Sequence, residues 1–263
     1  MQTPRLMAVL AHPDDESLGV GGTLAKYASE GADVFLLTAT RGDGGRYRGL
    51  PQGDPAHPGR AALAEIREKE LRAAAAVLRL RDVALLDYHD QQLDRADVRE
   101  AVSSVASHLR RVRPQVVLTF GPDGAYGHPD HVAISQLATG AVVRAADREC
   151  VVSKLYYIAW SAPTWAAYQS ALKKLTSTVD GVERHVVPAP DWGVSARIDT
   201  SDEWPTVWRA VQCHRTQMSI YKNLEGLPAE HHRALWGVQE FYRAFSRVNG
   251  GRGRESDLFE GLR

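Results

Sequence analysis

The sequence predicts a doubly wound α/β fold with a mostly parallel sheet. Two observations support this prediction: five short apolar runs alternate with helical patterns along the first 160 residues, and neither a linker nor an internal repeat divides the chain. With 263 residues, of which 44% are hydrophobic and 24% charged, the chain can bury a core of ordinary size. We therefore expect a single domain over 1–263, with a core at 1–160 and a C-terminal elaboration at 161–263.

The predicted strands and helices of the core follow one another in strict alternation. The strands are the apolar runs at 6–11, 33–38, 83–86, 115–120 and 154–159. The helices are the amphipathic or alanine-rich stretches at 18–29, 60–80, 96–112 and 129–146. Pro114 ends the third helix, and Pro129 suits the first turn of the fourth. With the common strand order 3-2-1-4-5, the sheet is Rossmann-like and its first and fourth strands are neighbours.

Two parts of the chain lie outside this alternation. Residues 41–59 contain six glycines and three prolines and are expected to form a long loop. Beyond residue 160 the pattern predicts two further helices and two further strands. The helices are expected at 163–175 and, capped by Ser201, at 201–214, and the strands at 193–199 and 241–246.

The charge balance argues against a nucleic-acid or membrane partner. Lys+Arg and Asp+Glu number 32 each, so no overall field favours polyanions or anionic lipid. No segment resembles a signal peptide or has the length and apolarity of a membrane span, which makes the cytoplasm the expected location. Cys150 and Cys213 lie far apart and are expected to be free thiols. The expected partner is a small molecule, and the oligomeric state is left open.

Two polar clusters stand where strands of the predicted sheet end. The segment 11–16, AHPDDE, follows the first strand, and the segment 127–131, GHPDH, follows the fourth. Because these strands are neighbours whose connections leave in opposite directions, a crevice opens at their carboxyl ends. We therefore expect both clusters to line one crevice.

Histidines and carboxylates gathered in one crevice suit a catalytic zinc site, which uses three protein ligands and keeps one position open. The residues alone predict two ligands from the first cluster and one from the second. Asp14 and Asp15 are adjacent and cannot easily both face one ion, so one would bind the metal while the other addresses the bound water. His128 and His131 share a helix face, so one would bind the metal while the other faces the substrate.

The paired clusters resemble those of the PIG-L/LmbE-like family of metal-dependent N-deacetylases, which act on N-acetylglucosaminyl compounds. Weaker matches to the family are 40–43 (TRGD), 86–90 (LDYHD) and 214–217 (HRTQ). The resemblance implies that His12, Asp15 and His131 bind one zinc ion per chain, with Fe²⁺ or another divalent ion as the alternative in the cell. It also implies that Asp14 is the general base.

The resemblance assigns further roles around the same crevice. It implies that His128 polarises the amide carbonyl or stabilises the oxyanion, and that Asp130 beside it orients a ring. Tyr126 would help to bind the tetrahedral intermediate, and Arg41 would contact the substrate.

The expected reaction is hydrolysis of an N-acetyl amide on an N-acetylglucosaminyl compound, which releases acetate and a free amine. Precursors of low-molecular-weight thiols are the leading substrates, and N-acetylglucosaminyl malate, as in bacillithiol-type synthesis, fits the arginines near the pocket. Inositol, antibiotic or oligosaccharide conjugates are the alternatives. Three other classes compete: a metal-dependent phosphoesterase with two ions, a dinucleotide-binding domain, which 19–22 (GVGG) fits poorly, and a non-catalytic binding module.

Overall fold

A seven-stranded sheet organises the chain, with the strand order β3-β2-β1-β4-β5-β9-β8. The computed structural model describes residues 3–172, 176–248 and 253–262. Five strands run parallel in the predicted order 3-2-1-4-5, namely β3 (Asp82–Tyr88), β2 (Asp33–Thr40), β1 (Arg5–Leu10), β4 (Val116–Thr119) and β5 (Lys154–Ala159). The fold prediction is therefore confirmed.

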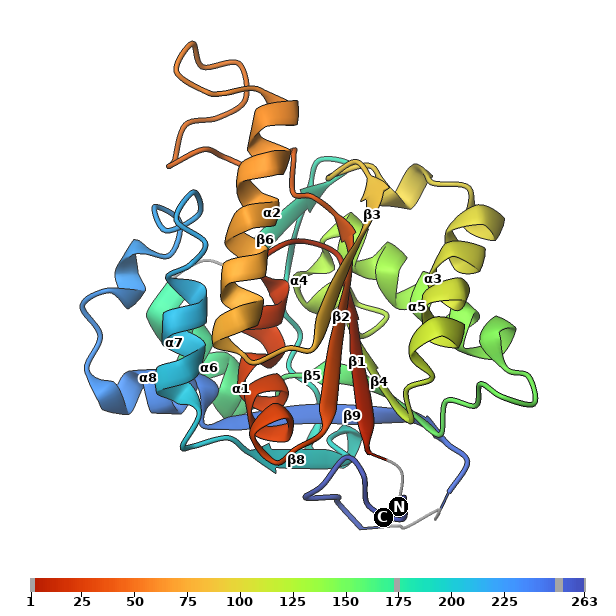
Figure 1. The fold of residues 1–263 in the computed structure, drawn as a ribbon. Helices are drawn as coiled ribbons and strands as arrows, with labels where there is room; N and C mark the ends of the chain where they lie inside the picture. Colours follow the sequence, from red (N-terminus) through yellow and green to blue (C-terminus); the bar gives the residue numbers. More distant parts are fainter. Residues whose placement is uncertain (1–2, 173–175, 249–252, 263) are drawn as a thin grey trace.

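Helices cover both faces of this sheet (Figure 1). One face carries α1 (Asp15–Ser29), α2 (Arg60–Val77) and α7 (Trp204–Val211), and the other carries α3 (Val98–Val112) and α5 (Pro129–Ala145). Strands covered on both sides must be apolar on both sides. Accordingly, β1 and β4 are buried almost throughout, which explains their continuous apolar runs in the sequence.

The C-terminal segment extends the sheet and adds a second hydrophobic cluster. The strands β9 (Val238–Ser246) and β8 (Ala196–Asp199) join β5 in antiparallel pairing. Two helices, α6 (Ala162–Leu172) and α8 (Ala229–Trp236), pack with α7 around buried Tyr168 and Trp236. The hairpin of β6 (Thr176–Val179) and β7 (Val182–His185) was not predicted, because its strands are short and exposed. Short helical turns complete the chain: η1 (Leu93–Arg95), α4 (Gly124–Gly127), η2 (Asp191–Gly193) and η3 (Lys222–Leu224).

Some predicted helix ends differ from the observed ones. The first helix begins at Asp15, not at residue 18, so Asp14 occupies its N-cap position. Ser201 does not cap α7; a turn in which Glu203 N donates to Thr200 O at 2.9 Å precedes that helix. The predicted end of the helix at 163–175 lies outside the described residues. Nowhere in the described ranges is a helix both long and apolar enough to cross a bilayer.

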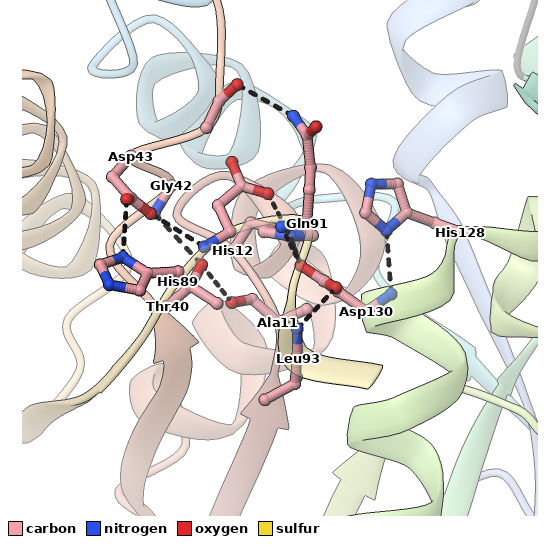
Figure 2. A network of polar contacts seen from close by, with 12 residues as sticks. Ala11, His12, Thr40, Gly42, Asp43, His89, Gln91, Leu93, His128 and Asp130 are labelled. Atoms are coloured by element: carbon pink, nitrogen blue, oxygen red, sulfur yellow. Dashed lines mark hydrogen bonds and ion pairs between the residues drawn. The ribbon is translucent and has the colours of Figure 1, made fainter. Parts of the chain in front are cut away.

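The predicted loop at 41–59 is fixed to the sheet edge by Asp43. Its carboxylate accepts hydrogen bonds from Asp90 N at 2.8 Å and from Arg60 Nε at 2.8 Å, and it lies 3.0 Å from His89 Nδ1. Figure 2 shows Asp43 and His89 facing each other beside the turn after β2. The loop is therefore anchored next to the carboxyl ends of β1, β2 and β3 at its start.

Candidate metal centre and active site

The turns after β1 and β4 meet at the carboxyl edge of the sheet. His12 lies on the turn after β1, Asp15 begins α1, and His131 lies in the first turn of α5. His12 Nδ1 is 3.2 Å from His131 Nε2, and these nitrogens lie 3.6 Å and 3.3 Å from different oxygens of Asp15. All three side chains are buried. Two segments 119 positions apart in the sequence thus place their ligand-type atoms around one point.

These side chains have the chemistry and the spacing that a divalent cation requires. In a tetrahedral zinc site with zinc–nitrogen distances of 2.0–2.1 Å, neighbouring ligand atoms stand roughly 3.3 Å apart. The separations among His12, Asp15 and His131 are close to this value. A ring nitrogen of His128 also lies within 4.8 Å of ring nitrogens of the other two histidines, which makes it a further donor within reach. The residues present therefore fit a metal ion.

The far side of the His12 ring faces two carboxylates. His12 Nε2 lies 3.1 Å from Asp90 Oδ1 and 3.1 Å from Asp130 Oδ2. Carboxylates in this position hold the proton on Nε2 and leave Nδ1 with its lone pair for a metal. Burial alone would lower the pKa of His12, but Asp90, Asp130 and Asp15 together raise that pKa well above its ordinary value. The cluster thus carries more negative than positive charge, which a bound cation would balance.

Asp130 is held rigidly between its own helix and the turn after β3. Gln91 N donates to Asp130 Oδ2 at 2.7 Å, and Leu93 N donates to Asp130 Oδ1 at 3.1 Å (Figure 2). The carboxylate therefore orients the ring of His12. It does not orient the neighbouring His128, whose Nδ1 instead accepts the backbone N–H of Asp130 at 3.2 Å.

Asp14 occupies an unusual backbone conformation in the middle of the site. Its φ of 111° lies in the region that residues other than glycine rarely adopt, as happens at functional sites. Two donors hold one carboxylate oxygen, Oδ2: the Tyr221 hydroxyl at 2.7 Å and Arg67 Nη2 at 3.2 Å. Burial raises the pKa of Asp14, and the Arg67 guanidinium offsets only part of that rise. A buried carboxylate with a raised pKa suits a base that must take up a proton.

A buried pair behind Asp14 supports its backbone. Glu16 Oε2 accepts the Asp14 N–H at 2.9 Å, while Glu16 Oε1 accepts the Ser17 hydroxyl at 2.5 Å and lies 2.8 Å from His214 Nε2. Glu16 and His214 are completely buried. Burial raises the pKa of Glu16, but the His214 ring and the hydrogen bonds from Ser17 and the Asp14 N–H together more than offset this, so the pKa lies below its ordinary value. His214 thus acts on the site through Glu16.

His128 and Tyr126 face the same cluster from the other side. Burial, reinforced by His12 and His131, lowers the pKa of His128 to about 4, so its ring is neutral at physiological pH. The Tyr126 ring centroid lies 5.3 Å from that of His131. Burial and the nearby carboxylates, Asp15 foremost, raise the pKa of Tyr126, so its hydroxyl keeps its proton. Both side chains can donate hydrogen bonds to a substrate, and their catalytic roles stay predictions.

Arg41 is turned away from this cluster. Its Nε donates to Asp87 Oδ1 at 3.0 Å, and its Nη1 pairs closely with Glu68. Arg41 is not among the residues that line the cavity over the site, and its contact with a substrate stays a prediction. Among the described residues, the arginines that line the cavity over the site are Arg46 and Arg67.

Three residues of the site were not identified from the sequence. Asp90 follows β3, so the topological reasoning used for the other two clusters could have found it. Arg67 carries no local sequence signal of its role, yet it is buried and donates to Gly42 O at 2.9 Å and to Asp14. Tyr221 lies in an irregular segment without periodic pattern, so no sequence signal pointed to it.

A cavity of about 500 Å³ opens over these residues. The histidines and carboxylates on its floor are His12, Asp14, Asp15, Asp90, His128 and His131. The polar residues around the floor are Arg46, Arg67, Gln91, Tyr126, Thr176, Gln217 and Tyr221. The volume lies in the range of pockets that hold small molecules.

Comparison with known proteins assigns the family. Residues 7–142 match the PIG-L family model, described as GlcNAc-PI de-N-acetylase. The chain belongs to this family. It is also 34% identical to the 1D-myo-inositol 2-acetamido-2-deoxy-alpha-D-glucopyranoside deacetylase of Mycobacteroides abscessus, with 100% of this chain and 99% of that protein covered. The enzyme of the same name from Kineococcus radiotolerans is 33% identical, with 99% and 84% covered.

Solved structures agree on the fold. The conserved protein TT1542 of Thermus thermophilus aligns with a TM-score of 0.64 and 28% identity over 93% of this chain and 96% of that one. Membership of the PIG-L family confirms the predicted family and shows that the chain is a hydrolytic enzyme of the deacetylase type, which acts on amides. The competing classes, a phosphoesterase, a dinucleotide-binding domain and a non-catalytic module, are thereby set aside.

Proposed function

We propose that this enzyme hydrolyses the N-acetyl amide of an N-acetylglucosaminyl compound, with a zinc ion held by His12, Asp15 and His131. The observation that carries the proposal is the placement of these side chains around one point, with His12 Nδ1 3.2 Å from His131 Nε2 and each nitrogen near an oxygen of Asp15. When bound there, zinc lowers the pKa of a water molecule to about 7 and polarises the amide carbonyl.

The residues of the chain supply the proton transfers and the orientation. Asp14 takes the proton of the attacking water, because its carboxylate stands next to the metal ligands and has a raised pKa. Tyr221 and Arg67 both hold Oδ2 of Asp14 and so fix the orientation of the base. The same proton, carried by Asp14, then passes to the leaving amine, so that acetate and a free amine result.

The developing negative charge of the amide oxygen needs donors that are already in place. His128 is neutral and Tyr126 keeps its proton, so each can donate a hydrogen bond to that oxygen. A donor of this kind contributes about 2.7–4 kcal/mol to stabilising the transition state. Asp130 and Asp90 keep His12 oriented, and Phe120 stacks on His131 with ring centroids 3.9 Å apart.

The full-length relatives suggest which conjugate to test first. Those relatives are named as deacetylases of an inositol glycoside of N-acetylglucosamine, and they match almost all of this chain. The names of these relatives therefore make the inositol conjugate one to test ahead of the malate conjugate. Arg41 pairs with Asp87 and Glu68 and does not line the cavity. Of the two described arginines that do, Arg67 already donates to Asp14, which leaves Arg46 as the cation for a malate carboxylate.

The test is release of acetate from N-acetylglucosaminides by the purified enzyme. The inositol, malate and methyl glycosides of N-acetylglucosamine are each incubated with zinc-loaded and with chelated enzyme, and acetate and free amine are measured. We expect acetate and amine in equal amounts from at least one glycoside with loaded enzyme only. Failure of the loaded enzyme on all three, or equal rates after chelation, would refute the proposal.

A further inference from the structure

One wall of the cavity over the proposed metal centre is mainly apolar, whereas the floor is polar. Five side chains form it, and we call them the apolar wall: Leu18, Trp160, Tyr168, Leu172 and Ile220. They come from α1, the end of β5, α6 and the segment before η3. Polar residues that line the cavity elsewhere, Arg46, Gln91 and Gln217, belong to other segments of the chain.

Four of the five wall residues belong to the second hydrophobic cluster or pack against it, and Ile220 adjoins them in the cavity lining. Trp160 stacks on Tyr168 with ring centroids 4.7 Å apart, and Leu18, Trp160 and Leu172 all pack against that cluster. The Tyr168 hydroxyl donates to Leu18 O at 2.7 Å, so it is already engaged. Ile220 is 50% exposed at the rim, although the segment around it is otherwise tied to the site by Tyr221. Apolar surface left open beside a reaction centre indicates that a ligand covers it.

The apolar wall and the proposed metal ligands line the same cavity, so part of a bound substrate lies beside the wall. In an N-acetylglucosaminide the acetamido group is on C2, and the aglycone is on the adjacent C1. A substrate whose amide lies at His12, Asp15 and His131 therefore places its aglycone in the same cavity. Leu18, Leu172 and Ile220 carry no hydrogen-bonding group, so hydroxyl groups pressed against them would lose water without replacement.

On this basis, and resting on the proposed function, we propose that the aglycone of the natural substrate carries an alkyl or aryl group that packs against the apolar wall. The wall then works as a specificity subsite, separate from the residues that hold the metal and the base. This differs from the polyol that the names of the relatives specify.

The experiment compares α-glycosides of N-acetylglucosamine that share the amide and differ in the aglycone. The probes are the methyl, n-hexyl, phenyl and inositol glycosides, assayed for acetate release by zinc-loaded full-length enzyme. We expect kcat/KM for the hexyl and phenyl glycosides to exceed that for the methyl glycoside by about tenfold or more, chiefly through a lower KM. Both should also exceed the inositol glycoside. Equal values for the hexyl and methyl glycosides, or a preference for the inositol glycoside, would overturn the inference.

Two further experiments test whether the apolar wall causes the preference and which part of the substrate it contacts. In Ile220→Asn the advantage of the hexyl over the methyl glycoside should fall by several-fold, whereas the control Val143→Asn, an exposed valine of α5 outside the cavity, should keep it. A methyl glycoside that carries an N-hexanoyl group tests whether the wall receives the acyl chain instead. A preference for N-hexanoyl over N-acetyl, or an unchanged ratio in Ile220→Asn, would contradict the assignment to the aglycone.

The outcomes separate this inference from the function on which it rests. Acetate released without any preference for an apolar aglycone removes the inference and leaves the deacetylase function standing. No acetate from any of the glycosides with loaded enzyme refutes the proposed function, and the inference falls with it.

Discussion

Two buried polar clusters in this enzyme, one around a single carboxylate and one around four, differ in how their charge is balanced. Under the antiparallel edge of the sheet, Glu255 meets Lys154 Nζ at 2.7 Å and Arg243 Nη1 at 2.8 Å, and it accepts the Tyr156 hydroxyl. At the carboxyl ends of β1, β3 and β4, four aspartates face several histidines and a single buried guanidinium, that of Arg67. In the first group the carboxylate is matched by two cations, whereas in the second the four carboxylates outnumber the cations.

The difference indicates which group is structural and which is functional. A buried carboxylate with matched cations fixes the packing of the elements that carry it, and removing one partner leaves an uncompensated buried charge. A group of carboxylates short of positive charge persists in a fold when a ligand completes it, as a cation would do here. Changes in the first group should therefore act on stability, and changes in the second on metal binding and turnover.

The largest effect is expected for Asp14→Asn. The substitution keeps the shape of the side chain and the proposed metal ligands but removes the proposed base, so kcat should fall by about 10²–10⁴-fold while zinc content stays unchanged. Acetate release and metal analysis measure the two quantities on the same sample. Asp202→Asn, at an exposed position, is the matched control and should keep full turnover. Wild-type turnover in Asp14→Asn would show that Asp14 is not the base.

The structural role of the Glu255 cluster is tested by Lys154→Met. This change leaves Glu255 without its closest cation, and the free energy of unfolding should fall by about 3–5 kcal/mol. Urea denaturation measures the loss, and acetate release per folded molecule should stay at the wild-type value. The double variant Lys154→Met with Glu255→Leu should recover part of the stability. Normal stability together with reduced turnover would contradict a purely structural role.

A pH-dependent contribution to stability is expected from Glu240. Burial raises the pKa of this carboxyl. Hydrogen bonds from Ser161 and Thr164 and the nearby Arg197 lower the pKa by more than burial raises it, so the folded-state pKa lies below the ordinary value. The stabilisation is therefore present above the ordinary glutamate pKa of 4.5 and is lost as the pH falls through the folded-state pKa.

Glu240→Gln should therefore lower the free energy of unfolding by about 1.5–3 kcal/mol at neutral pH. The difference from the wild type should shrink steadily below pH 4.5. Thermal or urea unfolding at a series of pH values measures both quantities. A difference that grows as the pH falls would show that the folded-state pKa of Glu240 is raised, not lowered.

The smallest effect is expected for Tyr221→Phe. The change removes one of the two donors to Asp14 Oδ2, so the base is less well oriented and kcat should fall about tenfold. Zinc content and KM should change little, because neither the metal ligands nor the cavity floor is altered. Tyr242→Phe, on β9 and away from the site, provides the control. An unchanged kcat in Tyr221→Phe would show that Arg67 alone suffices.

The sequence predicted the parts of the site that depend on topology. The apolar runs revealed the five parallel strands, and the strand order placed AHPDDE and GHPDH at neighbouring strand ends, where the structure brings them together. Asp90 follows the same rule at the end of β3 and could have been included. These features depend on local periodicity and on one topological regularity, both of which are visible in a single sequence.

Other parts depend on tertiary contacts that no local pattern reveals. The sequence shows only that Arg41 and Arg67 are charged. The fold shows that Arg41 pairs with Glu68 and Asp87. It also shows that Arg67 donates a hydrogen bond to Asp14. Tyr221 reaches Asp14 from 207 positions away along the chain, through an irregular segment. The apolar wall likewise forms only when α6 packs beside α1, so its composition could not be inferred from the sequence.

The central claim is tested most directly by counting metal ions in matched variants. Elemental analysis of the purified enzyme should find one zinc ion per chain in the wild type and in Asp14→Asn, and almost none in His12→Ala or His131→Ala. Two ions per chain in the wild type, or a full complement in His131→Ala, would contradict a single metal centre shared by the turns after β1 and β4.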